Sequence, residues 1–278
     1  MVVPDGGPLV LLPGMNCSER LWAGLAPEGA VVLRLTEPSL TAQVDRLLDE
    51  LPSRFGLVGL SLGAVVAMAV TRTAPERVAG LVLMSTNPYG PTEQQLLSWR
   101  RERDRLSAGE SARELQQDLL PVLLSPASLS RRTDLVETTL AMADDVGETE
   151  LDAQLRLQAT RVDERPGLRE VRCPTLVIAA RHDRLCPLDR HEEVATLVPG
   201  ARLQVLEHAA HLSPLEQPST VRRLLAWPVE SQQTARRNAM LACTSLTQRR
   251  MERQDVEDFL ISFYGPSYAS NIYRTSGA

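Results

Sequence analysis

The chain has 278 residues, 43% of them hydrophobic, and a formal net charge of −5. This apolar content is enough for a sizeable core, and the scattered basic residues argue against a nucleic-acid surface. All 30 basic residues are arginine, and the lack of lysine excludes Schiff-base chemistry and a Walker-type phosphate loop.

The cysteines and the first residues of the chain indicate in which cellular compartment the protein is expected. Cys17, Cys173, Cys186 and Cys243 are widely spaced without a C-x-x-C pair, which argues against a disulfide framework in a chain of this size. Residues 1–14 lack the basic start and the full apolar segment of a signal peptide. No stretch has the roughly 20 apolar residues needed to cross a bilayer. We therefore expect a reduced, cytoplasmic protein that does not associate with membranes.

The first part of the chain alternates between strand and helix patterns. Short apolar runs bounded by turn residues predict strands, and apolar positions at helical spacing predict helices. In chain order, these patterns predict strands at 8–14, 30–35, 55–60 and 79–86, and helices at 40–51 and 62–73. The strands are apolar along their length, which is typical of a parallel sheet covered on both faces, so we expect an α/β fold.

A G-x-S-x-G motif, formed by Gly59, Ser61 and Gly63, lies between a predicted strand and a predicted helix. So tight a turn holds the serine in a strained backbone conformation and leaves no room for a side chain at either glycine. The hydroxyl would then stand clear of the sheet edge, near the free N–H groups of the helix start. The motif predicts a nucleophile that carries an oxyanion. The alternative is a glycine-rich turn with an idle serine.

The alternation stops at Asn87, and helical patterns occupy the next 80 or so residues. We expect helices at about 93–106, 110–123, 129–142 and 148–162, separated by Gly109, by residues 125–128 and by Gly147. Four helices exceed what one strand connection needs. We therefore interpret residues 88–167 as a helical cap inserted into a core formed by 1–87 and 168–228. The alternative is a set of ordinary crossover helices.

The sheet pattern then resumes with strands at 173–180 and 202–206 and helices at 188–197 and through Trp227. Asp183 directly follows the first of these strands, and His211 follows the second. A serine nucleophile needs a base and an acid that orients that base. Where the serine lies in a strand–turn–helix motif, the acid follows it in the chain and the histidine comes last. Because the carboxyl ends of parallel strands converge at one edge, we expect Ser61, Asp183 and His211 to meet there.

Other residues compete for these roles. His208 lies in the same loop as His211, and Asp163 and Asp189 are alternatives to Asp183 in less suitable positions. Cys17 and Cys186 are expected near the site as packing or pocket residues. The histidines and cysteines show no plausible metal-ligand set.

Residues 9–227 resemble a capped, esterase-like bacterial enzyme of the α/β-hydrolase superfamily. The resemblance is carried by residues 11–15, the motif at 59–63, Asp183 with Pro187, and residues 211–218. It implies an α/β-hydrolase fold, with a mostly parallel sheet flanked by helices and an inserted helical cap. Glu216, five residues after His211, matches the family pattern and favours His211 over His208.

The resemblance also implies the chemistry. Ser61, His211 and Asp183 would form a catalytic triad, and the backbone N–H groups of Met15 and Leu62 would form the oxyanion hole. We expect a serine hydrolase that cleaves a small carboxylic ester, or a similar acyl substrate, without cofactor or metal. The same triad serves thioesterases, carbon–carbon bond hydrolases and cofactor-free perhydrolases. A non-catalytic ligand-binding receptor and a protein-interaction module are alternatives from other classes.

Three features depart from the family pattern. Pro13-Gly14 replaces the His-Gly that many relatives carry in the first loop, and the antiparallel strands common before the first parallel strand are not expected here. Residues 229–278 extend past the last expected helix. The segment 239–263 could be helical, or the extension partly disordered. With one sheet edge left short, this extension could cover it or mediate a homo-oligomer.

Overall fold

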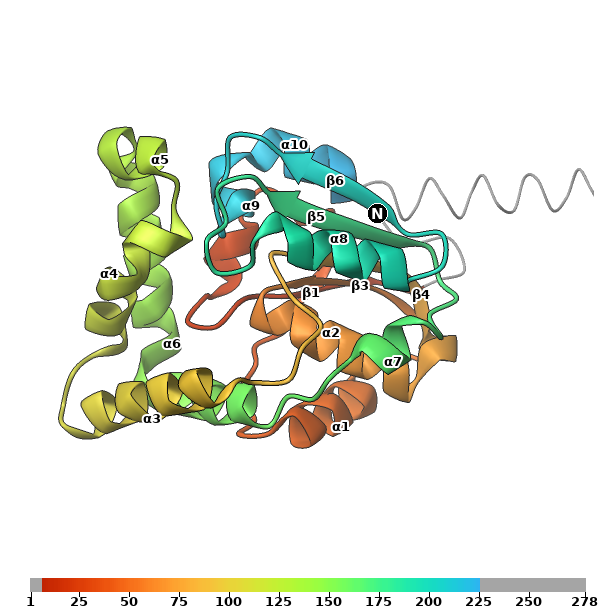
Figure 1. The fold of residues 1–278 in the computed structure, drawn as a ribbon, viewed down its shortest axis with the longest axis horizontal. Helices are drawn as coiled ribbons and strands as arrows, with labels where there is room; N and C mark the ends of the chain where they lie inside the picture. The colour runs from red at the N-terminus through yellow and green to blue at the C-terminus, as the bar shows by residue number, and fades with distance from the viewer. Residues whose placement is uncertain (1–6, 226–278) are drawn as a thin grey trace, which may run out of the picture. The chain divides into compact units, whose positions relative to one another are not determined.

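The computed structural model describes residues 7–225, and their core is a six-stranded parallel sheet (Figure 1). The strands follow the spatial order β2-β1-β3-β4-β5-β6. They are β1 (Leu9–Leu12), β2 (Val31–Val32), β3 (Phe55–Leu60), β4 (Val78–Met84), β5 (Thr175–Ala180) and β6 (Arg202–Leu206). The predicted α/β fold is therefore confirmed. The order reverses between β1 and β3, and such a switch point opens a crevice at the carboxyl ends of the strands.

Successive residues of the central strands face opposite sides of the sheet, and each side has its own core cluster. Leu57 and Leu81 pack with helices on one side, whereas their neighbours Val58 and Val82 pack on the other. The first side is covered by α1 (Leu40–Glu50), α2 (Leu62–Thr73) and α8 (Leu188–Leu197). The second side is covered by η1 (Glu19–Trp22) and α10 (Pro218–Leu225). Burial on both faces explains why the strand sequences are continuously apolar.

Between β4 and β5 the structure places helices and no strand within the described part of the chain. These are α3 (Glu93–Ser107), α4 (Ala112–Leu123), α5 (Pro126–Arg131), α6 (Thr133–Ala159) and the short α7 (Arg165–Leu168). Helices α3, α4, α5 and α6, which we call the cap helices, lie together beside the sheet (Figure 1). Helices α3, α4 and α6 share a hydrophobic cluster that includes Trp99, Leu115 and Leu151.

Two details of the cap helices differ from the sequence prediction. The segment at 125–128, expected as a separator, begins helix α5, because the Ser125 side chain accepts the Ser128 N–H and Pro126 occupies the first helical position. The expected separator Gly147 lies inside α6, where its φ of 69° and ψ of 172° interrupt the helical geometry. Glycine adopts this conformation without steric cost, so the helix bends here and resumes.

Polar contacts hold the cap helices to the core. Asp145 of α6 accepts hydrogen bonds from the Ser18 hydroxyl (2.7 Å) and the Arg20 guanidinium (2.6 Å). Where the chain returns to the core, the Glu164 N–H donates to the Pro88 carbonyl at 2.8 Å. The outgoing and returning segments therefore lie side by side at this point.

Two further predictions concern a short strand and the C-terminal extension. The strand expected at 30–35 is only Val31–Val32 in the structure. The extension at 229–278, with its proposed helix at 239–263, lies outside the described residues. Among the described residues, no helix is both long and apolar enough to span a membrane.

Candidate active site

Ser61 occupies a sharp turn between β3 and α2. Its φ of 54° and ψ of −114° lie in a region that non-glycine residues rarely adopt, and its N–H donates to the Met84 carbonyl at 2.9 Å. A Cβ at Gly59 would lie 2.4 Å from the Gly63 carbonyl oxygen, and one at Gly63 would lie 2.2 Å from the Leu12 carbonyl oxygen. Both glycines are therefore required for the close approach of α2 to β3 and β1.

His211 and Asp183 form a buried pair at the same edge of the sheet. His211 Nδ1 lies 2.9 Å from Asp183 Oδ2 and 3.1 Å from Oδ1, and both side chains are at most 4% exposed. Asp183 Oδ1 also accepts the Leu185 and Cys186 N–H groups, at 2.9 and 2.8 Å. These bonds fix the carboxylate and leave Nε2 as the ring nitrogen available to other groups.

The surroundings keep Asp183 ionised. Burial by itself raises the pKa of this carboxyl, but the His211 ring and the backbone N–H of Cys186 outweigh it, so the pKa lies below its ordinary value. An ionised Asp183 favours the His211 tautomer that carries its proton on Nδ1. Nε2 is then able to accept a proton.

Contacts from distant segments position the His211 loop. The Ser85 hydroxyl donates to the His211 carbonyl at 2.9 Å, and Ser85 itself has a φ of 47°. Glu216 accepts the Ala210 N–H at 2.5 Å and the Ser125 N–H at 2.9 Å. Glu216 therefore stabilises the conformation of the His211 loop and also connects this loop to the start of α5.

The remaining histidines lie elsewhere. His208 and His182 are exposed at the surface. His191 is fully buried, accepts the Thr86 N–H through Nε2 at 3.0 Å, and has Nδ1 3.2 Å from the Pro187 carbonyl. It joins the end of β4 to the start of α8, a structural role that its position in the sequence does not indicate.

The loop after β1 approaches the serine turn. Among residues 7–225, the N–H groups of Met15 and Leu62 have no hydrogen-bond acceptor, and Met15 lines the same pocket as Ser61. The next residue, Asn16, has a φ of 55° and is bound by the cap helices. Its N–H donates to Gln154 Oε1 (2.7 Å), and its side-chain amide donates to Gln116 Oε1 (3.0 Å). The cap helices therefore help to set the conformation of this loop.

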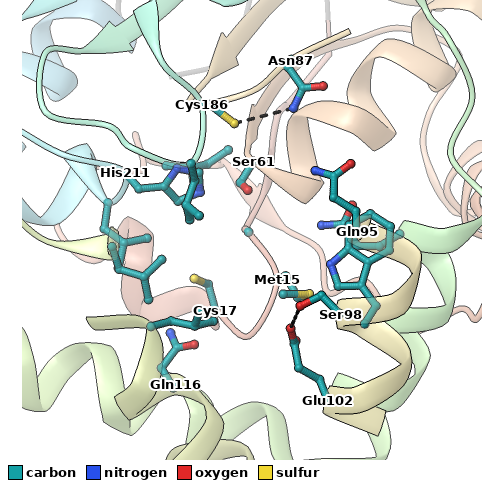
Figure 2. A pocket seen from close by; sticks show the side chains of 18 of the residues that line it. Met15, Cys17, Ser61, Asn87, Gln95, Ser98, Glu102, Gln116, Cys186 and His211 are labelled. Atoms are coloured by element: carbon teal, nitrogen blue, oxygen red, sulfur yellow. Dashed lines mark hydrogen bonds between the residues drawn. The ribbon is translucent and has the colours of Figure 1, made fainter. Parts of the chain in front are cut away.

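Ser61 and His211 face a pocket of about 250 Å³ between the sheet edge and the cap helices. Figure 2 shows His211 and Ser61 on the core side, with Gln95, Ser98 and Glu102 of α3 across the open space. The predicted pocket residues Cys17 and Cys186 both line it. Its volume lies slightly below the range of roughly 300–1,000 Å³ that is usual for small-molecule sites.

Asp183, Cys186 and His211 offer potential metal ligands within 4.8 Å of one another. The donors suit a metal poorly. Burial, with the nearby Asp183 charge, raises the pKa of the Cys186 thiol to about 12, and metals bind the thiolate. The Asp183 oxygens are already engaged by His211 and by backbone N–H groups.

The pocket also contains residues that the sequence analysis did not identify. Gln95, Gln116, Gln158 and Arg161 line it with their polar side chains. Nothing in the sequence distinguishes them, because glutamines and arginines are frequent on the exposed faces of these helices as well.

Comparisons with known proteins agree with this geometry. The family model described as "Alpha/beta hydrolase family" matches residues 9–224. The chain therefore belongs to the α/β hydrolase family and is an enzyme of that family, a hydrolase.

Individual relatives extend the comparison. The pimeloyl-[acyl-carrier protein] methyl ester esterase of Aromatoleum aromaticum is 30% identical over 76% of this chain and 93% of its own length. A thermophilic esterase from Thermogutta terrifontis superposes with a TM-score of 0.71 at 24% identity, covering 81% of this chain and 89% of that one. A hydrolase from Pseudomonas aeruginosa superposes with a TM-score of 0.70 at 25% identity, covering 82% and 92%.

Proposed function

We propose that the protein is a serine hydrolase that cleaves a small carboxylic ester, with Ser61, His211 and Asp183 as its catalytic triad. The observation that carries the proposal is the placement of a strained, pocket-facing Ser61 opposite a histidine whose Nδ1 is held by a buried carboxylate. Strain at a serine is costly and is found mainly where function requires it.

The proposed reaction follows from these positions. Ser61 Oγ attacks the ester carbonyl carbon while His211 Nε2 takes the hydroxyl proton, and Asp183 stabilises the imidazolium that forms. The Met15 and Leu62 N–H groups bind the oxyanion, and removing one such donor typically costs about 2.7–4 kcal/mol of transition-state stabilisation. His211 then gives the proton to the leaving alcohol. Water, activated by the same histidine, releases the carboxylic acid and restores Ser61.

Two further observations support this choice of substrate. The relative from Aromatoleum aromaticum is by name a methyl ester esterase, which favours an ester over other acyl bonds. The pocket is small and lies against the cap helices, so we assign residues 88–167 the role of a specificity cap. The proposed reaction needs no cofactor, because the chain itself supplies the nucleophile, the base and the oxyanion donors.

A fluorophosphonate probe tests the assignment of the nucleophile. We expect it to label Ser61, and we expect Ser61→Ala to abolish labelling while the protein stays folded by circular dichroism. Ser98→Ala is the matched control, because Ser98 lines the same pocket outside the turn and its loss should leave labelling intact. Labelling that survives in Ser61→Ala would show that another residue is the nucleophile.

An ester panel tests the reaction type. Turnover of short methyl and nitrophenyl esters supports the proposal, whereas faster turnover of matched thioesters or diketones would reassign the subtype. Stoichiometric ligand binding with no turnover of any panel member would indicate the receptor alternative instead.

We also propose a cytoplasmic location. Cys17, Cys173 and Cys186 are free thiols in the structure, and burial raises the pKa of each. Buried free thiols are typical of proteins in reducing compartments. Fractionation of the native host would test this.

A further inference from the structure

Arg161 lies in the wall of the candidate pocket, at the point where the chain leaves α6. It is 7% exposed and is the one buried arginine among residues 7–225. Arginine is rarely buried unless a carboxylate accompanies it, since moving a cation out of water is costly. The partners of Arg161 in the structure therefore show whether its charge is compensated.

Every partner of this guanidinium in the described chain is neutral. One Nη donates to Gln158 Oε1 at 3.2 Å and the other to Gln95 Oε1 at 3.3 Å, and the group lies 5.4 Å from the Trp99 ring centroid. The buried Nε has no hydrogen-bond partner. Two of the five N–H donors are used, so three remain, Nε–H among them.

The pocket has no acid that completes this pair. Glu102 also lines the pocket, but its carboxyl accepts from the Ser98 hydroxyl at 3.3 Å. Burial raises the pKa of Glu102. Among residues 7–225, Arg161 forms no ion pair with a carboxylate, and its hydrogen bonds go to the neutral Gln158 and Gln95.

Arg161 lines the same pocket as Ser61 and His211. Cys186 lines it too, and the Cys186 sulfur lies within 4.8 Å of the side-chain donor atoms of Asp183 and His211. A ligand bound at Ser61 and filling this small pocket would therefore come near the guanidinium. Each Nη of Arg161 keeps one N–H beyond its bond to Gln158 or Gln95, and these two N–H groups are donors that suit a carboxylate.

We infer that Arg161 binds a carboxylate of the substrate, so that the enzyme acts on esters whose acyl part ends in a second, ionised carboxyl group. This inference rests on the proposed esterase function. The Ser61 end would hold the ester carbonyl, and Arg161 would hold the free carboxylate. A charged hydrogen-bonded pair of this kind is worth roughly ten- to hundredfold in affinity.

Matched esters test the inference. Monomethyl esters of linear dicarboxylic acids with four to eight carbons carry the second carboxylate, and the dimethyl esters of the same acids do not. For at least one chain length, we expect kcat/KM of the wild type to be about tenfold or more higher for the monoester. Arg161→Gln should remove this preference mainly by raising KM for the monoester, so that the kcat/KM values of the two esters become similar.

Two variants make the comparison specific. Arg156→Gln removes the same charge from an exposed position of α6, and it should leave the preference intact. Arg161→Lys keeps the charge without the planar guanidinium and should retain only part of the preference for the monoester. This variant also tests the inference if the glutamine variant does not fold. No preference at any chain length, or a preference unchanged in both Arg161 variants, would overturn the inference.

A binding measurement separates this inference from the proposed function. In Ser61→Ala protein, calorimetry should detect the dicarboxylate of the preferred length, and adding Arg161→Gln should weaken binding about tenfold or more. Arg161-dependent binding without labelling of Ser61 in the wild type would support the carboxylate site and refute the esterase. If the wild type hydrolyses dimethyl esters but the dicarboxylate binds equally well with and without Arg161→Gln, the esterase function is supported and the carboxylate site is refuted.

Discussion

Two histidines three positions apart, His208 and His211, have opposite surroundings. His208 is exposed, whereas His211 is 3% exposed and its Nδ1 is held by Asp183. The difference arises from the backbone, since the loop is buried from Ala209 onward and the Ser85 hydroxyl donates to the His211 carbonyl. Only a histidine with one nitrogen oriented by an anion presents the other to a nucleophile in a fixed tautomer.

Substitutions at these positions give opposite expectations. His211→Ala should lower kcat for a generic ester by several orders of magnitude, and Asp183→Asn should lower it by roughly 10⁴ by favouring the wrong tautomer. His208→Ala serves as the control and should change kcat less than about threefold. Steady-state kinetics would decide, and a larger loss in His208→Ala than in His211→Ala would show that the base is misassigned.

At the scale of elements, His191 joins β4 to α8, and its imidazole ring must stay neutral to do so. Its Nε2 accepts the Thr86 N–H, which requires an unprotonated nitrogen there. Burial lowers its pKa below 6.5. Below pH 6.5 the unfolded chain therefore binds a proton that the folded protein excludes. The stabilising effect is fully present above pH 6.5 and is lost as the pH falls toward the folded-state pKa.

This linkage gives a measurable slope. Between pH 6.5 and 5, His191 should make the free energy of unfolding decrease by up to about 1.4 kcal/mol per pH unit. His191→Gln, whose amide can accept the Thr86 N–H without titrating, should show a shallower slope in urea melts. His182→Gln, at an exposed position, should retain the wild-type slope. Identical slopes in all three proteins would exclude His191 as the source.

The cap helices supply apolar as well as polar walls to the pocket. Leu119 and Leu123 of α4 line it, and Leu123 is 6% exposed. We expect Leu119→Ala to enlarge the pocket and raise the relative kcat/KM for longer acyl chains by several-fold, because deleting a side chain removes a steric limit.

The matched control for this change lies on a neighbouring cap helix. Leu97 of α3 is 45% exposed and does not line the pocket, so Leu97→Ala should leave the chain-length profile unchanged. Fluorophosphonate labelling of Ser61 should persist in both variants. A chain-length profile that shifts equally in both would mean that the cap acts through its stability and not through the shape of the pocket.

At the scale of the whole molecule, every group proposed for the reaction lies between Gly14 and Leu212. Deleting residues 231–278 should therefore preserve single-turnover acylation of Ser61. We also expect the deletion to lower thermal stability or oligomer size, which melting and sedimentation would measure. A folded, truncated protein that cannot acylate Ser61 would place part of the active site in the deleted segment.

The fold and the motif are properties that local sequence largely determines. Uninterrupted apolar runs such as Phe55–Leu60 predict strands buried on both faces, and the period of the intervening segments predicts helices, as the structure bears out. The G-x-S-x-G spacing around Ser61 predicts a strained turn because only glycine fits there, since a Cβ at Gly59 would lie 2.4 Å from the Gly63 carbonyl oxygen of α2. Helix boundaries inside the cap, at Ser125 and Gly147, were less accurate because capping and bending depend on packing.

Other properties were decided only by tertiary structure. In the sequence, Arg161 is one of 30 arginines and His191 one of four histidines, with nothing local to single them out. What makes each one informative is burial among segments far apart in the chain, such as Gln95 beside Arg161 and Thr86 beside His191. The cost of burying a polar or charged group depends on which partners surround it, and those partners are assembled only when the helices pack on the sheet.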